Sequence, residues 1–491
     1  MSRTSAGQPA PAWSLLALTA AVATTVLTGL LGASAAVSPL PGRRLGWLPP
    51  YAMNVDPPPA VVSALMALSV LAGAAGLVGA SRALRHGWQP DPRRLLAAGA
   101  LAVAALAVLP PIGSADPKSY AAYGRMAATG RDPYVTTPAE LAASGDPVGA
   151  AVESPWQRSP SVYGPLATAE QALVARAAGD STRAAVGLLG LVNAAAFLGI
   201  STLLQCLAVT AARRRRVALL WSVNPLLLQQ LVAGAHLDTL VVLAVVSALA
   251  LSARRGSAAG LPAGIAAGIA AGSAAALKLP GGAVAVVMAW QARRSPARLA
   301  AVLTGVAAVV GTGYALIGVH GLDQVRRASR FVSLASPWRP LATVLDDRYP
   351  GARTVLSLCA LGLTLALAGL LLRGLPGRDE PGLATVRATL ALTLAFVLTA
   401  TYQLPWYDGT AWALMALLPA SVFDGILLAH TTVLSLAYIP GRDVMLPIAL
   451  ARTTEAARSG IAPFLLMGVL AWTILAVRSA PPLGYSSRQG E

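Results

Sequence analysis

AVVSALMALSVLAGAAGLVGAS, the stretch at residues 60–81, contains no charged side chain. A helix of about 20 apolar residues crosses the roughly 30 Å hydrocarbon core of a bilayer, because each residue adds about 1.5 Å. The stretch is therefore predicted to be a membrane-spanning helix. We expect helices in the other apolar runs as well, since the sequence lacks the alternating strands of about ten residues that form membrane barrels.

Roughly fourteen runs of this kind follow one another along the chain. They lie at about 13–37, 60–81, 95–113, 183–211, 217–233, 238–253, 261–277, 280–292, 299–319, 354–372, 383–401, 409–421, 422–439 and 460–478. Hydrophobic residues make up 56% of the 491 positions and charged residues 12%, against about 25% charged in an ordinary soluble domain. We predict an all-α polytopic membrane protein, with a single integral membrane domain over residues 1–491 and about 12 to 14 transmembrane helices. The first run is expected to be a retained helix.

The net charge of +17 comes from 37 basic and 20 acidic residues. Nucleic-acid binding is not expected, because that function calls for basic clusters with interleaved aromatic residues. The arginines instead mark the ends of apolar runs, as in cytoplasmic loops. The clusters are Arg82/Arg85/Arg93/Arg94, Arg213 to Arg216, Arg254/Arg255, Arg293/Arg294 and Arg373/Arg378. The pattern predicts a multi-pass protein of the plasma membrane, in contact with membrane lipids, with cytoplasmic termini.

This orientation places two long polar segments outside the membrane. Residues 114–180 become a large first extracytoplasmic loop, and residues 320–353 a second one. The short turns around His236, Lys278 and Trp406 fall on the same side. Arginines of the second loop depart from the charge rule, which asks for a functional explanation.

The first loop opens with DPKSYAAYGR at residues 116–125. Asp116, Tyr120 and Tyr123 share one face of a helix that would end near Gly130, because they are spaced i, i+4 and i+7. A carboxylate there can accept a proton from a sugar hydroxyl, and the tyrosines can stack on or hydrogen-bond to the sugar. With Lys118 and Arg125, the segment suits a ligand that carries both hydroxyls and a phosphate. The alternative is that Asp116 merely caps the helix that Pro117 begins.

Two further segments are candidates for the same site. Tyr163 lies in a turn, SPSVYGPL at residues 159–166. Residues 221–238 hold an Asn-Pro pair that interrupts a helix and then His236 and Asp238, which face a cavity if they lie at membrane depth. Asp238 as a simple helix cap is the alternative. We expect no metal site, since the ligand spacing for zinc is incomplete and the two cysteines, Cys206 and Cys359, are read as buried apolar residues.

Cations and aromatic residues complete the candidate list. Lys278 lies between two apolar runs, where it either snorkels to the interface or binds substrate. Arg327 and Arg330 carry guanidinium groups suited to phosphate. Trp406 and Tyr407 stand at a helix end, where an interfacial aromatic belt is the simpler explanation and substrate contact the other.

Four of these motifs together resemble the actinobacterial polyprenyl-phosphate-mannose-dependent α-1,6-mannosyltransferases, over roughly residues 13–478. They are the aspartate of the first large loop, Val162 to Pro165, Asn224 to Asp238, and Leu404 to Tyr407. The resemblance implies a GT-C-type membrane glycosyltransferase, with a GT-C-like bundle, that uses a lipid-linked sugar on the outer face. It also implies that Asp116 is the catalytic base. One departure is Leu237, which stands where many family patterns have Asn.

The mechanism we expect from this resemblance is inverting transfer of mannose from polyprenyl-phosphate-mannose to a growing α-1,6-mannan, such as a lipomannan. Lys278 with Arg327 or Arg330 would stabilise the leaving phosphate. No organic cofactor is expected, and the dependence on a divalent metal stays open. Two alternatives remain: an arabinofuranosyltransferase using polyprenyl-phosphate-arabinose, and a flippase or transporter of lipid-linked sugars, which would not need a base.

Overall fold

The computed structural model describes residues 12–253, 260–318 and 320–479. Within those ranges every regular element is a helix, and an isolated bridge pairs Val37 with Ile112. The prediction of an all-α polytopic membrane protein is confirmed. Arg254 and Arg255, one of the predicted cytoplasmic clusters, lie outside the described residues.

Eight helices of the described part are long and apolar enough to cross a membrane. They are α1 (Ala12–Leu31), α2 (Pro59–Arg85), α8 (Thr182–Leu207), α12 (Gly260–Leu277), α14 (Pro296–Ile317), α17 (Ala352–Gly374), η6 with α18 (Pro381–Thr399) and α21 to α22 (Ile448–Arg478). A ninth candidate is a pair bent by 118°, formed by Ala211–Ala233 and α11 (Asp238–Ser252). The number is lower than the number of apolar runs, partly because two of the runs are the arms of this pair. Two others form the shorter helices Leu279–Ala292 and α20 (Val422–Ala437).

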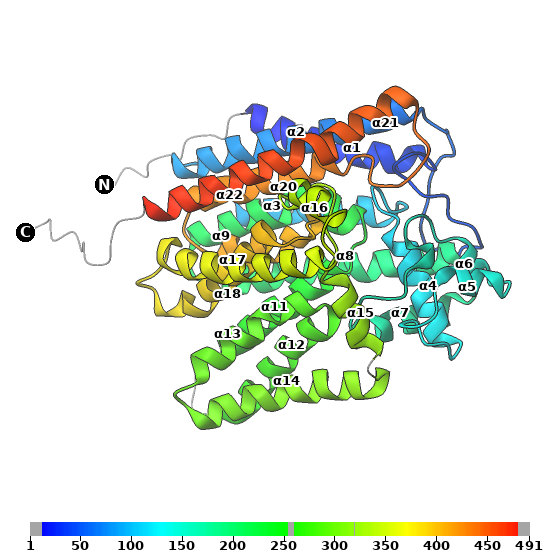
Figure 1. The fold of residues 1–491 in the computed structure, drawn as a ribbon. Helices are drawn as coiled ribbons and strands as arrows, with labels where there is room; N and C mark the ends of the chain where they lie inside the picture. The colour runs from blue at the N-terminus through cyan, green and yellow to red at the C-terminus, as the bar shows by residue number, and fades with distance from the viewer. Residues whose placement is uncertain (1–11, 254–259, 319, 480–491) are drawn as a thin grey trace, which may run out of the picture.

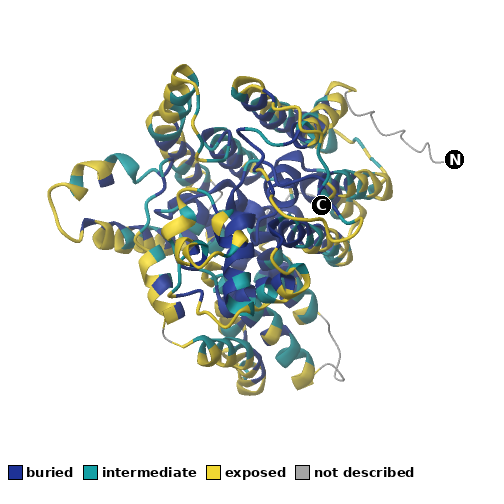
Figure 2. Cartoon of the chain, turned by 90° about the vertical axis from the view of Figure 1, so that its right-hand side faces the viewer, coloured by how far each residue is buried: buried dark blue, intermediate teal, exposed yellow. Residues whose placement is uncertain are grey.

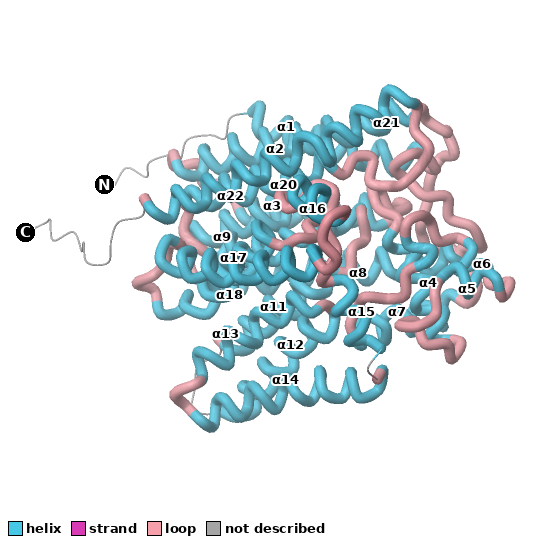
Figure 3. Tube along the Cα trace, in the orientation of Figure 1, coloured by secondary structure: helices cyan, strands magenta, loops and turns pink. Residues whose placement is uncertain are grey.

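The long helices run roughly side by side, and their connections differ strongly between the two ends (Figure 1). One end, which we call the arginine end because it carries Arg82/Arg85, Arg213 to Arg216 and Arg373/Arg378, holds the C-terminal end of α2, the segment α9 (Ala211–Val217) and the connection between α17 and α18. The loop end, at the right of the view, holds most of the long loops (Figure 3). Seen from the loop end, buried segments fill the centre and exposed ones the rim (Figure 2).

Apolar side chains on the rim fit a protein whose solvent is lipid. Leu361 and Leu365 of α17 are 55% and 58% exposed, and Phe464 of α22 is 59% exposed. Cys206 and Cys359 are exposed too. The expectation that both cysteines are buried is therefore wrong, because their helix faces point outward from the bundle.

Ion pairs fasten the helices together at the arginine end. Arg216 of α9 donates to both carboxylate oxygens of Asp424, whose Oδ1 is very close to Nη2 and whose Oδ2 is 2.8 Å from Nη1. Arg85 of α2 approaches the same carboxylate at 3.6 Å. One buried aspartate of α20 thus joins α2 and α9.

The first loop, residues 114–180, is a small helical subassembly at the loop end (Figure 1). Its elements are α4 (Asp116–Ala128), α5 (Pro138–Ala143), α6 (Pro147–Ala150), η1 (Trp156–Arg158) and α7 (Pro165–Ala178). Proline stands in the first turn of all four α-helices, where its missing N–H is not needed. Helix α4 packs closely on α7, since a Cβ on Gly124 would lie 2.1 Å from the carbonyl oxygen of Gln171.

The second loop contributes two short helices, α15 (His320–Ala328) and α16 (Arg339–Asp346). The Gln324 side chain donates to the backbone carbonyl of Tyr134 at 2.9 Å, which ties α15 to the first loop. The following residues reach the end of α18, where the Ser333 N–H donates to the carbonyl of Thr401 at 3.0 Å. Both polar loops therefore meet at one end of the bundle.

Candidate active site

Asp116 is the first residue of α4 and is held at a buried position. Its N–H donates to the Ser114 hydroxyl at 3.1 Å, and its Oδ2 accepts from the Tyr120 hydroxyl at 3.4 Å. The predicted shared face of Asp116 and Tyr120 is confirmed, as is a helix that ends before Gly130. The capping alternative is wrong: Ala115 is the N-cap residue, and the Asp116 carboxylate faces Tyr120 instead.

The predicted interruption near Pro225 is confirmed as a break inside the first arm of the bent pair, between η2 (Ala218–Ser222) and α10 (Pro225–Leu227), and the 118° bend follows at residues 234–237. Asn224 accepts from the N–H groups of Leu226 and Leu227 and restarts the helix there. A wide π-helical stretch, η3 (Leu228–Ala233), then runs to the turn, where Ala235 adopts a left-handed φ of +50°. Such wide turns are frequent at functional sites. The bend delivers His236 to the Asp116 carboxylate.

The His236 ring is held on one face and at one edge. Its Nδ1 is 2.5 Å from the Gln230 carbonyl, so Nδ1 carries the proton and donates it. Its ring stacks on Trp406, with centroids 3.6 Å apart. The remaining nitrogen, Nε2, is 3.9 Å from Oδ2 of Asp116, and within the described ranges it has no hydrogen-bond partner. The lone pair of His236 Nε2 and the Oδ2 of Asp116 thus face each other without a hydrogen bond between them.

Lys278 lies beside this pair and is held by two contacts. Its Nζ is 2.8 Å and 3.0 Å from the two carboxylate oxygens of Asp238, at the start of α11. The same Nζ lies 3.7 Å from the centroid of the Tyr407 ring. Lys278 therefore points into the protein, toward the bend, and the structure brings it together with Asp238 and Tyr407 as a cluster with Asp116.

Gly164 joins the first loop to the end of α12, next to Lys278. Its N–H donates to the Leu277 carbonyl at 3.0 Å. A Cβ at this position would lie 2.1 Å from the carbonyl oxygen of Ala276, so only glycine fits. This contact places Tyr163 edge-on to Tyr120, with ring centroids 5.2 Å apart. The glycine of the quoted turn thereby completes the aromatic wall of the site.

Sequence reasoning missed the network that supports Trp406 and Tyr407. Asp408 is fully buried, and its Oδ2 accepts from the Thr431 hydroxyl at 2.6 Å and from His430 Nδ1 at 2.9 Å. Trp412 donates to the same Thr431 hydroxyl at 2.9 Å. The available signal was Asp408 directly after the Trp-Tyr pair, in a run that is otherwise apolar.

Three predicted residues of α4 are not brought to the Asp116 carboxylate by direct bonds. Lys118 pairs with Glu153 at 2.7 Å, and Arg125 pairs with Asp146 at 2.8 Å. The Tyr123 hydroxyl donates to the Ser159 carbonyl at 2.8 Å, while its ring lies 6.4 Å from that of Tyr163. These contacts hold the first loop together, and substrate binding by the three residues stays a prediction.

Arg327 and Arg330 are exposed at the loop end. No carboxylate of the described ranges forms an ion pair with either one. Arg330 precedes Phe331, whose ring lies 5.9 Å from that of Tyr402, and Tyr402 lies 6.4 Å from Tyr407. The second loop thus reaches the edge of the cluster through aromatic residues, and substrate binding by Arg327 and Arg330 stays a prediction.

Burial dominates the electrostatics of the first loop. It raises the pKa of Asp116 to about 6, against the opposing effect of the Lys278 charge. Burial also lowers the pKa of Lys118, although Glu153 opposes this. Burial would raise the pKa of Glu153, but hydrogen bonds from Arg442 and Lys118 outweigh it and lower that pKa. A carboxyl group with a pKa near 6 is a stronger base than ordinary aspartate and is still mostly ionised at neutral pH.

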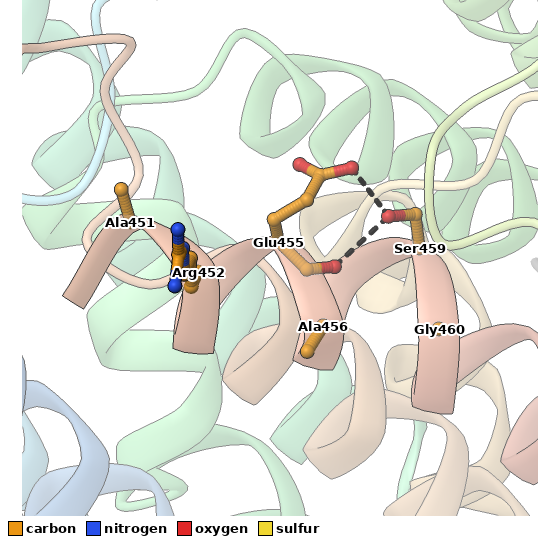
Figure 4. A pocket seen from close by; sticks show the side chains of 6 residues that line it. All are labelled: Ala451, Arg452, Glu455, Ala456, Ser459 and Gly460. Carbon is orange, nitrogen blue, oxygen red and sulfur yellow. Dashed lines mark hydrogen bonds between the residues drawn. The ribbon is translucent and has the colours of Figure 1, made fainter. Parts of the chain in front are cut away.

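Two other features were tested as sites. Across residues 12–253, 260–318 and 320–479, no group of three or more His, Cys, Asp and Glu side chains is arranged to hold a metal ion. A hollow of about 660 Å³ lies on α21 and the π-helical stretch η8 (Ala456–Ile461) (Figure 4). Its Ser459 hydroxyl is bonded to Glu455, at 2.9 Å from the carbonyl and 2.5 Å from Oε1. The polar groups of that hollow therefore satisfy each other.

Comparisons with known proteins agree on one family. A family model described as "Alpha-(1->6)-mannopyranosyltransferase, N-terminal domain" matches residues 15–294. The alpha-(1->6)-mannopyranosyltransferase of Mycobacterium tuberculosis is 32% identical over 140 residues, which are 28% of this chain and 23% of that protein. Alpha-(1->6)-mannopyranosyltransferase B of Corynebacterium glutamicum is 31% identical over 144 residues, again 28% and 23%. The aligned part thus spans less than a quarter of each relative.

Among solved structures, the archaeal oligosaccharyltransferase of Archaeoglobus fulgidus, in complex with an inhibitory peptide and a dolichol-phosphate, aligns with a TM-score of 0.37 and 14% identity. The alignment covers 80% of this chain and 56% of that one. The family model matches a longer part of the chain than either relative does. Its range contains Asp116, the bend at His236 and Lys278. Because it matches more than half of the sequence, the chain belongs to the alpha-(1->6)-mannopyranosyltransferase family.

Proposed function

We propose that this chain transfers mannose from polyprenyl-phosphate-mannose to a growing α-1,6-mannan acceptor, with inversion at the anomeric carbon. The observation that carries the proposal is the Asp116 carboxylate, whose Oδ2 lies 3.9 Å from the unprotonated Nε2 of His236. That distance is too long for a hydrogen bond, so Oδ2 can accept one from an incoming hydroxyl. Family membership supplies the sugar.

The chemistry proposed is a single displacement. The acceptor hydroxyl oxygen forms a bond to the anomeric carbon of a β-mannosyl phosphate, and the bond from that carbon to the phosphate oxygen breaks. Asp116 takes the hydroxyl proton, which its raised pKa of about 6 favours. The polyprenyl phosphate leaves with the bonding electrons, and the new linkage is α.

Lys278 is the cation proposed to act on the leaving phosphate. It is already oriented by Asp238 and by the Tyr407 ring, so it need not reorganise when negative charge appears. Arg327 or Arg330 would assist from the second loop. The aromatic residues Tyr120, Tyr163, Trp406 and Tyr407 offer flat faces and hydroxyls that suit a sugar ring.

We further propose that the site faces the outside of a plasma membrane. The long loops gather at the end opposite to α9 and the α17–α18 connection, which carry Arg213 to Arg216 and Arg373/Arg378 (Figure 1). Positive charge favours the cytoplasmic side, so the loop end would be extracytoplasmic. To test this orientation, a cysteine is introduced at Asp132 and labelled with a thiol reagent in intact cells. Labelling that an impermeant thiol reagent blocks would support an extracytoplasmic loop end.

The deciding experiment uses the purified full chain in detergent with radiolabelled polyprenyl-phosphate-mannose and an α-1,6-linked mannotetraose. We expect a labelled product one mannose longer, with an α linkage. Polyprenyl-phosphate-arabinose is tested in parallel. Transfer of arabinose alone would make the chain an arabinofuranosyltransferase.

The same assay separates the proposal from a flippase or transporter. Detergent removes the bilayer, so a protein that only moves lipid-linked sugar across a membrane would yield no elongated product. A chain that forms no product in detergent, yet moves the labelled lipid across the bilayer of a proteoliposome, would overturn the enzymatic assignment.

A further inference from the structure

A second polar cavity, of about 700 Å³, lies at the loop end and is reached by Lys118 of α4. Besides Lys118, its walls come from the connection between α1 and α2, Pro110, residues 150–154 with Gln157, Arg183 of α8, and the connection after α20. A volume of this size is within the range of small-molecule sites. Asp116, His236 and Lys278 are not among the described residues that line it, so the cavity is separate from the site above.

At one part of this cavity, two cations share a single carboxylate. The Glu153 carboxylate lies 2.7 Å from Lys118 Nζ and 2.8 Å from Arg442 Nη2, and it also accepts from the Ser38 hydroxyl at 3.1 Å. Arg442 extends from there to the backbone carbonyls of Ser34 and Val37. Lys118 and Arg442 therefore each have a partner already, although the three groups together keep one positive charge.

Other lining residues of the cavity offer hydrogen-bond donors and acceptors. Asn54 and Gln157 contribute amide groups, and the Gln157 Nε2 donates to the Val152 carbonyl at 3.0 Å. Arg183 donates through Nε to the Leu40 carbonyl at 3.2 Å. Arg44 lies over the ring of Tyr51, 4.7 Å from its centroid. Amide groups and an aromatic ring suit a ligand that carries many hydroxyls, and the guanidinium groups add N–H donors for those hydroxyls.

One short segment connects this cavity to the catalytic aspartate. Glu153, Ser154 and Gln157 line the cavity. Trp156, between them, lies close enough to the Asp116 carboxylate to lower its pKa, against the larger effect of burial. Lys118, which reaches the cavity, follows Asp116 by two positions on α4. A chain bound in the cavity can therefore approach the base across η1 (Trp156–Arg158).

We propose that this cavity binds the non-reacting hexose units of the acceptor chain, so that its terminal hydroxyl reaches Asp116. The inference rests on the proposed function, because it names the position of that function's acceptor. If the cavity binds these units, the protein is an elongating enzyme that contacts more than one sugar of its acceptor. A short acceptor would leave the cavity empty and bind more weakly.

The test is the double variant Asn54→Ala with Gln157→Ala, compared with Gln291→Ala, an exposed glutamine of α13 (Ala283–Ala292) far from the loop end. Initial rates are measured at saturating donor with methyl mannoside, mannobiose and mannotetraose, all α-1,6-linked where applicable. In the unaltered chain we expect the KM to fall with acceptor length. The double variant should raise the KM of mannotetraose about tenfold, through two lost hydrogen bonds, with kcat and the KM of methyl mannoside unchanged.

Two results would overturn the inference. One is a mannotetraose KM that is the same in the double variant and the unaltered chain. The other is a double variant whose rate changes only with the content of anionic lipid in the reconstituted vesicles, which would make the cavity a lipid headgroup site. The melting temperature of each variant guards against misfolding.

Failure of the proposed function is distinguished by a binding measurement. If the unaltered chain transfers no mannose, saturation-transfer NMR with mannotetraose and the purified full chain still tests the cavity. Binding that the double variant loses and Gln291→Ala keeps would support the inference. Equal signals from all three proteins, or none from any, would refute it.

Discussion

Two Asp–His pairs in this protein differ in how their hydrogen bonds are used. In the pair Asp408–His430, the carboxylate accepts from Nδ1 at 2.9 Å and from the Thr431 hydroxyl at 2.6 Å, and it is fully buried. In the pair Asp116–His236, Nδ1 is bonded to a backbone carbonyl, and Nε2 stays 3.9 Å from the carboxylate. The Asp116 side chain also keeps 13% of its surface exposed.

The difference separates a support from a reactive site. Short, saturated bonds around Asp408 fix the turn that carries Trp406 and Tyr407, and a buried carboxylate of this kind has no capacity left for a substrate. Each of the two histidines has an Nε2 without a hydrogen-bond partner among the described residues, but the two rings turn different nitrogens to their carboxylates. His430 donates to Asp408 through Nδ1, whereas His236 turns its unpartnered Nε2 to Asp116. We propose that the unbonded space between Nε2 and the Asp116 carboxylate serves catalysis.

The largest effect expected is loss of transfer in Asp116→Asn. The amide keeps the size of the carboxylate and the contact with Tyr120 but cannot take up a proton, so the rate should fall by about 10² to 10⁴-fold. Product formation from radiolabelled donor measures it. Asp180→Asn, an exposed aspartate of the same loop, is the control and should keep full activity. If Asp116→Asn still transferred mannose, Asp116 would not be the catalytic base, and neither Asp–His pair would have a catalytic role.

A second effect is expected on stability. Asp408→Ala removes the shared acceptor of His430 and Thr431, and each buried donor left unpaired costs about 1–3 kcal/mol. The melting temperature in detergent should drop clearly, and activity should fall with it because Trp406 and Tyr407 lose their support. Asp379→Ala, at an exposed position of the arginine end, should leave the melting temperature unchanged. An unaltered melting temperature in Asp408→Ala would contradict the structural role that we assign to Asp408.

The pH dependence sharpens the contrast further. Asp116 acts as the base only when ionised, and its pKa is raised to about 6. The value of kcat/KM should therefore be level above about pH 7 and fall toward tenfold per unit below pH 6. The residual rate of Asp116→Asn should lack this decline. A profile that stays level to pH 5, with the protein still folded, would show that Asp116 does not limit the rate through its ionisation.

The smallest effect expected is that of Arg327→Ala. This arginine is exposed, and an exposed contact with phosphate is worth less than about 1 kcal/mol, so the KM of the lipid donor should rise by less than about fivefold. The acceptor KM should not change. Arg348→Ala, another exposed arginine of the second loop, is the matched control. An identical donor KM in both variants would exclude Arg327 from donor binding.

Sequence patterns predicted the parts of the site that depend on local spacing. The start of α4, the shared face of Asp116 and Tyr120, and the break at Pro225 all follow from residues within a few turns of one another. The meeting of both polar loops at one end follows from the alternation of charged and apolar segments.

Contacts between distant residues were beyond reach. Lys118 and Arg125 look like substrate ligands in the sequence, but Glu153 and Asp146 bind them within the first loop. The partner of Lys278 is Asp238, across two helices, and His430 finds Asp408 from inside an apolar helix. The number of long spans also depends on where helices bend or stop short, which hydropathy alone does not report.

The contact at Gly164 sets a rule for exchanging parts between relatives. The first loop meets the spanning helices at the Ala276 carbonyl, with a clearance that no side chain can enter. A loop transplanted from another member of the family would dock only if its residue at this position were glycine and the recipient's α12 ended with the same geometry. Chimeras that aim to change acceptor choice should therefore carry the loop and the end of α12 as one cassette.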